Sequence, residues 1–257
     1  MPESLTHNFS LEGKVALVTG STTGLGKAMA QALGKAGAKV ALNYNNNKDR
    51  AEKAFQEFSD LGCSGSLFKA NIIDEDDVNK LIKNIEDDLG SVDIVVFNAT
   101  PDQPHCSIED YSWDFYQSML DFFIKSPFLI TRAILPSMKK KKWGRIINIG
   151  SEVFQLGVPE FSAYVAAKGG QNGWTRSMAR ELAPFGITVN MVSPGWIPVE
   201  RHEKEPQEWK DAYLPTVPAG RWGVPSDLDG VVTFLASESS SFVVGQNICV
   251  NGGLTVA

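Results

Sequence analysis

The chain has 257 residues, of which 43% are hydrophobic and 21% are charged, and its formal net charge is −6. This composition is typical of a globular protein and excludes general disorder. The negative charge argues against a nucleic-acid-binding protein, and no apolar run reaches the ~20 residues of a membrane span. The widely spaced cysteines Cys63, Cys106 and Cys249 favour a reduced cytoplasmic protein over a disulfide scaffold or a zinc site.

Apolar, β-rich segments alternate with helical patterns along the chain. Strands are expected at Lys14–Thr19, Lys39–Tyr44, Leu67–Ile72, Val92–Asn98, Arg145–Ile149, Ile187–Val192 and Asn247–Val250. Helices are expected at Gly24–Lys35, Arg50–Leu61, Asp74–Leu89, within Glu109–Lys141, and at Ser162–Ala183 and Asp227–Ala236. This alternation predicts an α/β fold, a single-domain Rossmann-type doubly wound seven-stranded parallel sheet with helices on both faces. Residues 1–10 are interpreted as an N-terminal tail and residues 196–223 as a substrate lid.

The first expected strand runs into a glycine-rich turn, TGSTTGLG, at residues 19–26. Glycines let the backbone turn tightly and approach a ligand closely, and the N-terminus of the following helix attracts a phosphate. The first strand–helix junction of an α/β chain is also where dinucleotides bind. The spacing differs from the commoner G-x-G-x-x-G, while Ser21 and Ala28 exclude a Walker A loop.

A second motif combines a tyrosine, a lysine and a serine. Tyr164 and Lys168 are four residues apart on an expected helix and therefore share a face. A nearby ammonium group lowers the pKa of a tyrosine hydroxyl from its ordinary value of about 10, which makes a usable general acid or base. Ser151 follows the strand RIINI, at an edge where α/β proteins form ligand sites, and could hydrogen-bond the carbonyl that Tyr164 protonates. A serine hydrolase is disfavoured, because the sequence around Ser151 is not a G-x-S-x-G nucleophile elbow.

The order of these motifs, together with NA at 98–99, YVAAK at 164–168 and SPG at 193–195, resembles the short-chain dehydrogenase/reductase superfamily over Leu11–Gly253. The opening SLEGKVALVTG and the late RWG, FLAS and VNGG are most similar to members that act on sugar acids and polyols. The resemblance implies NAD(P)-dependent hydride transfer to or from a small polar alcohol or ketone. Tyr164 would be the proton donor or acceptor, Lys168 would lower its pKa and hold the ribose, and Ser151 would orient the substrate oxygen. A homo-oligomer, specifically a tetramer, is also implied.

The same resemblance implies a set of residues that bind the cofactor. They are Gly20, Thr23, Gly24, Leu25, Gly26, Asn45, Asn71, Ile72, Asn98, Ala99, Tyr164, Lys168, Pro194, Gly195 and Ile197. After the second strand, where an NAD enzyme carries an acid for the ribose 2′-hydroxyl, this chain has Tyr44 and Asn45. The missing acid, with possible donors at residues 45–48, favours NADP(H) over NAD(H). No metal ligands are expected.

The sequence departs from the family at two functional positions. The family's NNAG is FNAT here, and the asparagine of its catalytic tetrad aligns with Phe123. In the family that asparagine lies at a helix distortion whose backbone carbonyl helps to hold a proton-relay water, so Phe123 predicts an altered or slower relay. Two alternatives remain open, namely a nicotinamide-binding sensor or scaffold without turnover and an epimerase or dehydratase that retains its cofactor. Candidates for the substrate wall are Asp102, Gln103, His105, Glu152, Phe154, Gln155, Trp196, Arg201 and His202.

Overall fold

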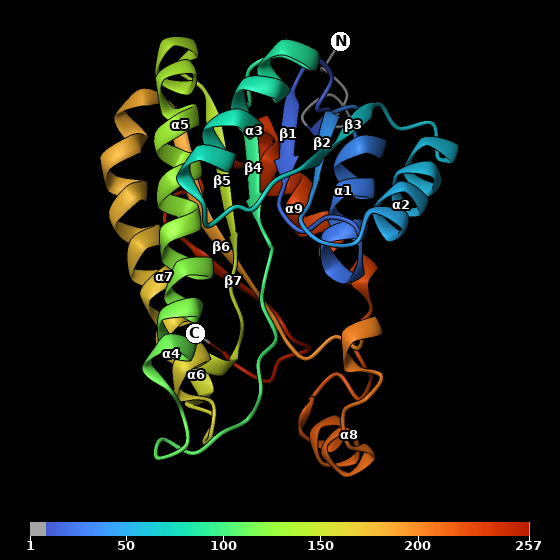
Figure 1. Cartoon of the computed structure of the whole chain (residues 1–257), viewed down its shortest axis with the longest axis vertical. Helices are drawn as coiled ribbons and strands as arrows, with labels where there is room; N and C mark the ends of the chain where they lie inside the picture. The colour runs from blue at the N-terminus through green and yellow to red at the C-terminus, as the bar shows by residue number, and fades with distance from the viewer. Residues whose placement is uncertain (1–8, 257) are drawn as a thin grey trace.

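In the computed structural model, seven parallel strands form one sheet in the order β3-β2-β1-β4-β5-β6-β7 (Figure 1). The structure describes residues 9–256, so most of the expected tail lies outside the described residues. The strands are β1 (Val15–Val18), β2 (Lys39–Tyr44), β3 (Gly65–Lys69), β4 (Ile94–Phe97), β5 (Gly144–Ile149), β6 (Ile187–Pro194) and β7 (Asn247–Val250). The chain crosses from β3 back to β4, beside β1, which confirms the doubly wound fold. A topological switch therefore lies between β1 and β4, at the kind of place where open α/β sheets bind ligands.

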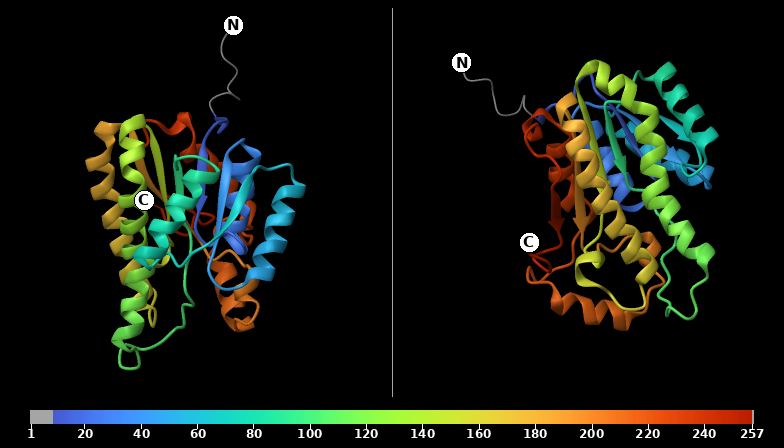
Figure 2. Two further views of the ribbon diagram at one scale, coloured as in Figure 1. Left: turned by 45° about the horizontal axis from the view of Figure 1, so that its top comes forward. Right: turned by 90° about the vertical axis from the view of Figure 1, so that its left-hand side faces the viewer.

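Helices cover both faces of the sheet and the edge beyond its carboxyl ends (Figures 1 and 2). One face carries α3 (Glu75–Asp88), α5 (Ser126–Lys141) and α7 (Ser162–Leu182), and the other carries α1 (Gly24–Lys35), α2 (Lys48–Asp60) and α9 (Asp229–Ala236). Three further helices are α4 (Trp113–Leu120), α6 (Val153–Leu156) and α8 (Gln207–Tyr213), which lie towards the lower end of the molecule in Figure 1. No helix within residues 9–256 is long and apolar enough to cross a membrane.

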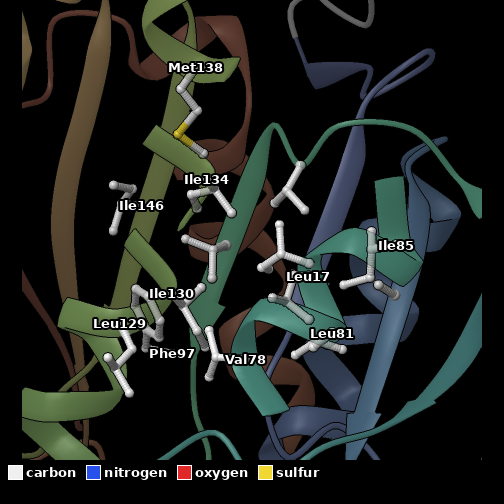
Figure 3. Packing of buried hydrophobic residues seen from close by; sticks show 14 of the residues in the cluster. Leu17, Val78, Leu81, Ile85, Phe97, Leu129, Ile130, Ile134, Met138 and Ile146 are labelled. Atoms are coloured by element: carbon white, nitrogen blue, oxygen red, sulfur yellow. The ribbon is translucent and has the colours of Figure 1, made fainter. Parts of the chain in front are cut away.

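The two faces of the sheet bury separate hydrophobic clusters, and alternation along β1 feeds both of them. Val15 and Leu17 belong to the cluster under α3, α5 and α7, part of which is drawn in Figure 3. Ala16 and Val18 belong to the cluster under α1, α2 and α9. Successive side chains of a strand point to opposite faces, so a strand buried on both sides is apolar throughout. This explains why the strands appear in the sequence as continuous apolar runs.

Some boundaries differ from the sequence expectation. β3 ends at Lys69, three residues early, because β2 ends at its partner Tyr44 and Asp74 then caps α3 by accepting from Asp77 N. The helix expected from Glu109 begins only at Trp113, because Ser112 caps it by accepting a hydrogen bond from Phe115 N. Residues 196–223, expected to have little regular structure, contain α8 and short 3₁₀ turns.

Candidate active site

The glycine turn after β1 packs tightly against the end of β4, across the switch point. Asn98 Nδ2 donates to Thr19 O and Gly20 O, both at 3.1 Å. In return Thr19 Oγ1 accepts from Asn98 N at 2.9 Å and from Ala99 N at 3.1 Å. A Cβ at Gly20 would lie 2.9 Å from Ala99 Cα, and one at Gly26 would overlap the Asn98 amide. The expected residues Gly20, Gly26, Asn98 and Ala99 therefore form one rigid unit.

Asn43 also holds this turn, although the sequence analysis did not single it out. It is 2% exposed, its Oδ1 accepts from Gly20 N at 3.3 Å, and its Nδ2 donates to Ala70 O at 3.2 Å. A buried polar side chain needs such partners, because an unpaired one costs free energy. The signal in the sequence was an asparagine inside the otherwise apolar strand VALNY.

The N-terminus of α1 already binds an anionic group. Glu200 Oε2 accepts a hydrogen bond from Thr23 Oγ1 and another from Gly24 N, both at 3.1 Å. An exposed N–H at a helix N-terminus, in the favourable field of the helix dipole, is also what binds a phosphate. The residues present therefore fit the pyrophosphate of a dinucleotide. Glu200 lay outside the sequence predictions, because nothing local in the sequence relates it to a turn 176 residues earlier.

The remaining expected cofactor residues are distributed around the same edge. Asn45 is exposed just after β2, whereas Asn47 caps α2 by accepting from Arg50 N, and Lys48 pairs with a glutamate one turn later. Only Asn45 and Asn46 of that segment therefore keep free polar side chains within the described structure. The side chain of Asn71 accepts from Ile73 N at 3.4 Å, and Ile72 is buried in the core.

The expected nicotinamide-binding segment follows β6 directly. Pro194 is the last residue of that strand, and Gly195 N donates to Val250 O at 3.1 Å. Ile197 is 3% exposed in the core cluster on the α1 side, with Leu25 packed against the same cluster. Only the backbone of Ile197 thus remains for a contact with a cofactor.

Ser151, Tyr164 and Lys168 come together beyond the carboxyl end of β5. Ser151 is close enough to the Tyr164 hydroxyl to lower its pKa, and Lys168 lies one turn further along α7. Lys168 Nζ donates to Ile149 O at 2.5 Å and to Gln171 Oε1 at 3.1 Å. Tyr164 and Lys168 are 7% and 3% exposed. The structure therefore brings the three expected catalytic side chains into one buried group.

A chain of buried amides continues from the lysine, and the sequence analysis missed it. Gln171 Nε2 donates to Asn148 Oδ1 at 3.3 Å, and Asn148 Nδ2 donates to Thr175 Oγ1 at 2.8 Å. Gln171 and Thr175 lie three and seven residues after Lys168, so they share its helix face. That spacing was the available signal. The chain holds the lysine in one position, because each polar atom in it is bound by the next.

Burial is the largest cause of the pKa shifts of Tyr164 and Lys168. It raises the pKa of Tyr164, while the positive charge of Arg201 and the hydrogen bond with Ser151 lower that pKa and offset only part of the effect. Burial, and after it the charge of Arg201, holds the pKa of Lys168 well below its usual range. The sequence predicted a lowered pKa for the phenol. The structure corrects this direction, because the desolvation of a fully enclosed hydroxyl outweighs its neighbours.

Phe123 lies in a π-helical segment, Asp121–Lys125, between α4 and α5. The expected helix distortion is therefore present although the asparagine is not. Pro127 lacks the N–H that would bond to Phe123 O in a regular α-helix, and Ser126 N instead donates to Asp121 O. The aromatic ring is 2% exposed, and its centroid lies 3.7 Å from Lys168 Nζ.

A row of aromatic rings extends from Tyr164 to α8. The Phe161 ring lies 5.2 Å from the Tyr164 ring, and the His105 ring stacks on Phe161 at 4.1 Å. On its other side His105 meets Trp209 of α8 at 4.8 Å. Of the other expected wall residues, Gln155 instead binds the C-terminal segment, where its Oε1 accepts from Thr255 Oγ1.

A buried hydrogen-bonded link ties the expected lid to the catalytic edge. The Tyr213 hydroxyl donates to Glu152 Oε1 at 2.7 Å and accepts from Trp196 N at 2.9 Å. The Trp222 ring stacks on Tyr213 at 5.3 Å. Glu152 is 3% exposed, and burial raises the pKa of its carboxyl. Glu152 and Trp196 are thus lid anchors, and Ser151 precedes the first of them directly.

Comparisons with known proteins agree with this geometry. Residues 20–255 match the family described as Enoyl-(Acyl carrier protein) reductase. The chain is 36% identical to a 2-dehydro-3-deoxy-D-gluconate 5-dehydrogenase from Formosa agariphila, covering 96% of this chain and 94% of that protein. It is 40% identical to a 3-oxoacyl-[acyl-carrier-protein] reductase from Haemophilus influenzae, covering 95% and 99%. Among solved structures, a gluconate 5-dehydrogenase from Burkholderia cenocepacia in complex with NADP and tartrate superposes with a TM-score of 0.91 at 31% identity, covering 98% and 99%.

Proposed function

The chain belongs to the short-chain dehydrogenase/reductase family and is an NAD(P)-dependent oxidoreductase. On that premise we propose that it interconverts a hydroxyl group and a keto group of a sugar acid. Tyr164 is the proposed proton donor or acceptor. The observation that carries the proposal is the position of the buried Tyr164 one helical turn before the buried Lys168 on α7, with Lys168 Nζ bonded to Ile149 O, two residues before Ser151. A nicotinamide, when bound, supplies or accepts the hydride. The protein residues have to bind the cofactor, orient the substrate and move the proton.

In the direction of ketone reduction each side chain has a defined task. Ser151 orients the substrate carbonyl by donating a hydrogen bond to its oxygen, and Tyr164 gives that oxygen its proton. The raised pKa of Tyr164 suits this direction, because the phenol stays protonated at neutral pH. The buried amides behind Lys168 keep its ammonium group close to the tyrosine. The ring of Phe161, which stacks on His105, covers one side of Tyr164.

The sugar-acid class is supported by the dehydrogenases named above and by the positive charge of Arg201, which acts on Tyr164 and Lys168. A second candidate, the reduction of a 3-oxoacyl thioester, is favoured by the relative from Haemophilus influenzae. The two candidates share the chemistry of Ser151 and Tyr164, and they differ in whether the substrate carries a free carboxylate or a long thioester arm.

We propose NADP(H) as the preferred cofactor, since an NADP complex occurs among the solved relatives and no acid follows β2 where Asn45 stands. An assembly of four chains is the proposed oligomeric state. A cytoplasmic location fits the three free cysteines, Cys63, Cys106 and Cys249.

A turnover screen tests this function directly. The purified protein is offered sugars, sugar acids, polyols and acetoacetyl-CoA with each nicotinamide cofactor, and the absorbance of the reduced cofactor is followed. We expect turnover of a sugar acid with NADP(H) and loss of that turnover in Tyr164→Phe. Turnover of acetoacetyl-CoA alone would favour the second candidate. Activity that survives in Tyr164→Phe would overturn the assigned chemistry.

A further inference from the structure

Arg201 is a cation with unused hydrogen-bond donors. It lies in the 3₁₀ turn Glu200–His202, and its Nε donates to His202 Nε2 at 3.0 Å. Among the described arginines, Arg132, Arg145 and Arg221 pair with carboxylates, whereas Arg50, Arg176 and Arg180, like Arg201, form no ion pair. Within residues 9–256, Arg201 forms no ion pair, and the two terminal nitrogens of its guanidinium group donate to no protein atom. Two parallel N–H groups therefore remain available to a ligand.

The neighbours of Arg201 place this turn over the candidate active site. Glu200, the residue before it, is bonded to the glycine turn at Thr23 and Gly24. His202, the residue after it, packs edge-on against Trp196 at 5.9 Å. Trp196 N donates to the Tyr213 hydroxyl, which donates to Glu152, the residue after Ser151. The 3₁₀ turn Glu200–His202 therefore connects the glycine turn to the segment that carries Ser151. The charge of Arg201 acts on Tyr164 and Lys168, and it lowers the pKa of both.

The His202 imidazole lies beside the guanidinium group of Arg201. Its pKa is lowered to about 4 by burial and by the charge of Arg201, so the imidazole is neutral at physiological pH. A neutral imidazole nitrogen can accept a hydrogen bond, whereas a protonated one cannot. His202 Nε2 lies 3.0 Å from Arg201 Nε and His202 Nδ1 lies 3.3 Å from Val199 N, so contacts on both sides fix the imidazole beside the guanidinium group.

We propose that Arg201 binds the carboxylate group of the substrate, and so selects acids over uncharged polyols of the same carbon skeleton. This deepens the proposed function and rests on it. A guanidinium group offers two N–H donors in the spacing that a carboxylate accepts, and such a bidentate pair is charge-assisted. His202 is the positioning residue for this contact.

The test uses two substrates that differ only at one carbon. D-gluconate carries a carboxylate where D-sorbitol carries a hydroxymethyl group, and the measured quantity is the ratio of their kcat/KM values. Because Arg201 also changes the pKa of Tyr164, a single rate would mix two effects, whereas the ratio cancels what both substrates share. We expect Arg201→Gln to lower the ratio by about 10- to 100-fold, which is the scale of one hydrogen-bonded charge pair. Arg201→Lys should retain part of the preference, and Lys204→Gln, which removes an exposed charge from the same segment, should retain all of it.

A binding measurement separates the inference from the proposed function. Tartrate, a small dicarboxylate, is titrated calorimetrically into the protein in the presence of NADP. We expect the Kd of tartrate to rise at least about tenfold in Arg201→Gln and to stay unchanged in Lys204→Gln. If gluconate is not turned over but this difference appears, the proposed substrate is wrong and the anion site stands. A native protein that binds tartrate no better than Arg201→Gln, or a kcat/KM ratio that this variant leaves unchanged, overturns the role of Arg201.

Discussion

Glu200→Gln should tighten the binding of NADP. The carboxylate of Glu200 accepts hydrogen bonds from Thr23 Oγ1 and Gly24 N, each at 3.1 Å, and these donors are the ones that fit a phosphate. Cofactor binding must therefore displace a negative charge from the N-terminus of α1. A glutamine can still accept the same hydrogen bonds, but it lacks the charge that the helix dipole stabilises.

The size of the effect follows from the exposure of this contact. A charge near the end of an exposed helix contributes about 0.3–1 kcal/mol. Removal of that competing interaction should lower the Kd of NADP by about 2- to 5-fold, since 1.4 kcal/mol corresponds to a factor of ten. The gain should shrink at high ionic strength, because the Glu200 side chain is exposed and salt screens exposed charges.

Fluorescence titration of NADPH into the protein measures this Kd without any turnover. Glu203→Gln is the matched control, because it removes the same charge from an exposed position three residues further along. Its Kd should equal that of the native protein. If Glu200→Gln binds NADPH no more tightly than Glu203→Gln, or more weakly, then the carboxylate stabilises the turn instead of competing with phosphate, and the reasoning fails.

Four further outcomes are expected. Tyr164→Phe should lower kcat by about 10²- to 10⁴-fold, which is the usual contribution of a general acid, and steady-state kinetics will show it. Gly26→Ala should destabilise the fold by about 1–3 kcal/mol in chemical denaturation, because its methyl group would overlap the Asn98 amide. The pKa of His202 falls from 6.5 to about 4 on folding, so the folded protein should lose stability as the pH drops through that interval. Thermal unfolding at pH 7 and at pH 4.5 should show that His202→Asn loses less stability on acidification than the native protein does. Phe123→Asn should change the rate or its pH profile, and identical profiles would remove the relay argument.

The sheet and the grouping of Tyr164 with Lys168 were predictable because local sequence encodes them. The strands are apolar on both faces, and the glycine turn follows β1 without interruption, so both stand out in a single pass along the chain. Tyr164 and Lys168 share a helix face by their spacing alone. The end of β3 could not be read in the same way, since it depends on where its partner β2 stops at Tyr44.

Contacts between distant segments were not predictable. The bonds from Glu200 to the turn at Thr23 and from Asn43 to Gly20 join residues that only the folded sheet brings together. The direction of the Tyr164 pKa was missed for a related reason. The spacing reveals the neighbouring lysine, but it does not reveal the ring of Phe123, which packs on Tyr164 from the π-helical segment Asp121–Lys125 and helps to bury it.

The role of Phe123 follows from separating the backbone of that residue from its side chain. Pro127 cannot donate to Phe123 O, so the helix distortion persists without an asparagine amide. The change therefore lies at the lysine. Lys168 Nζ donates hydrogen bonds to Ile149 O and to Gln171 Oε1. The ring of Phe123, 3.7 Å from Nζ, presents an aromatic face that stabilises a cation but accepts no transferable proton. We therefore expect Phe123 to slow the proton relay at Lys168, and the Phe123→Asn variant tests this expectation.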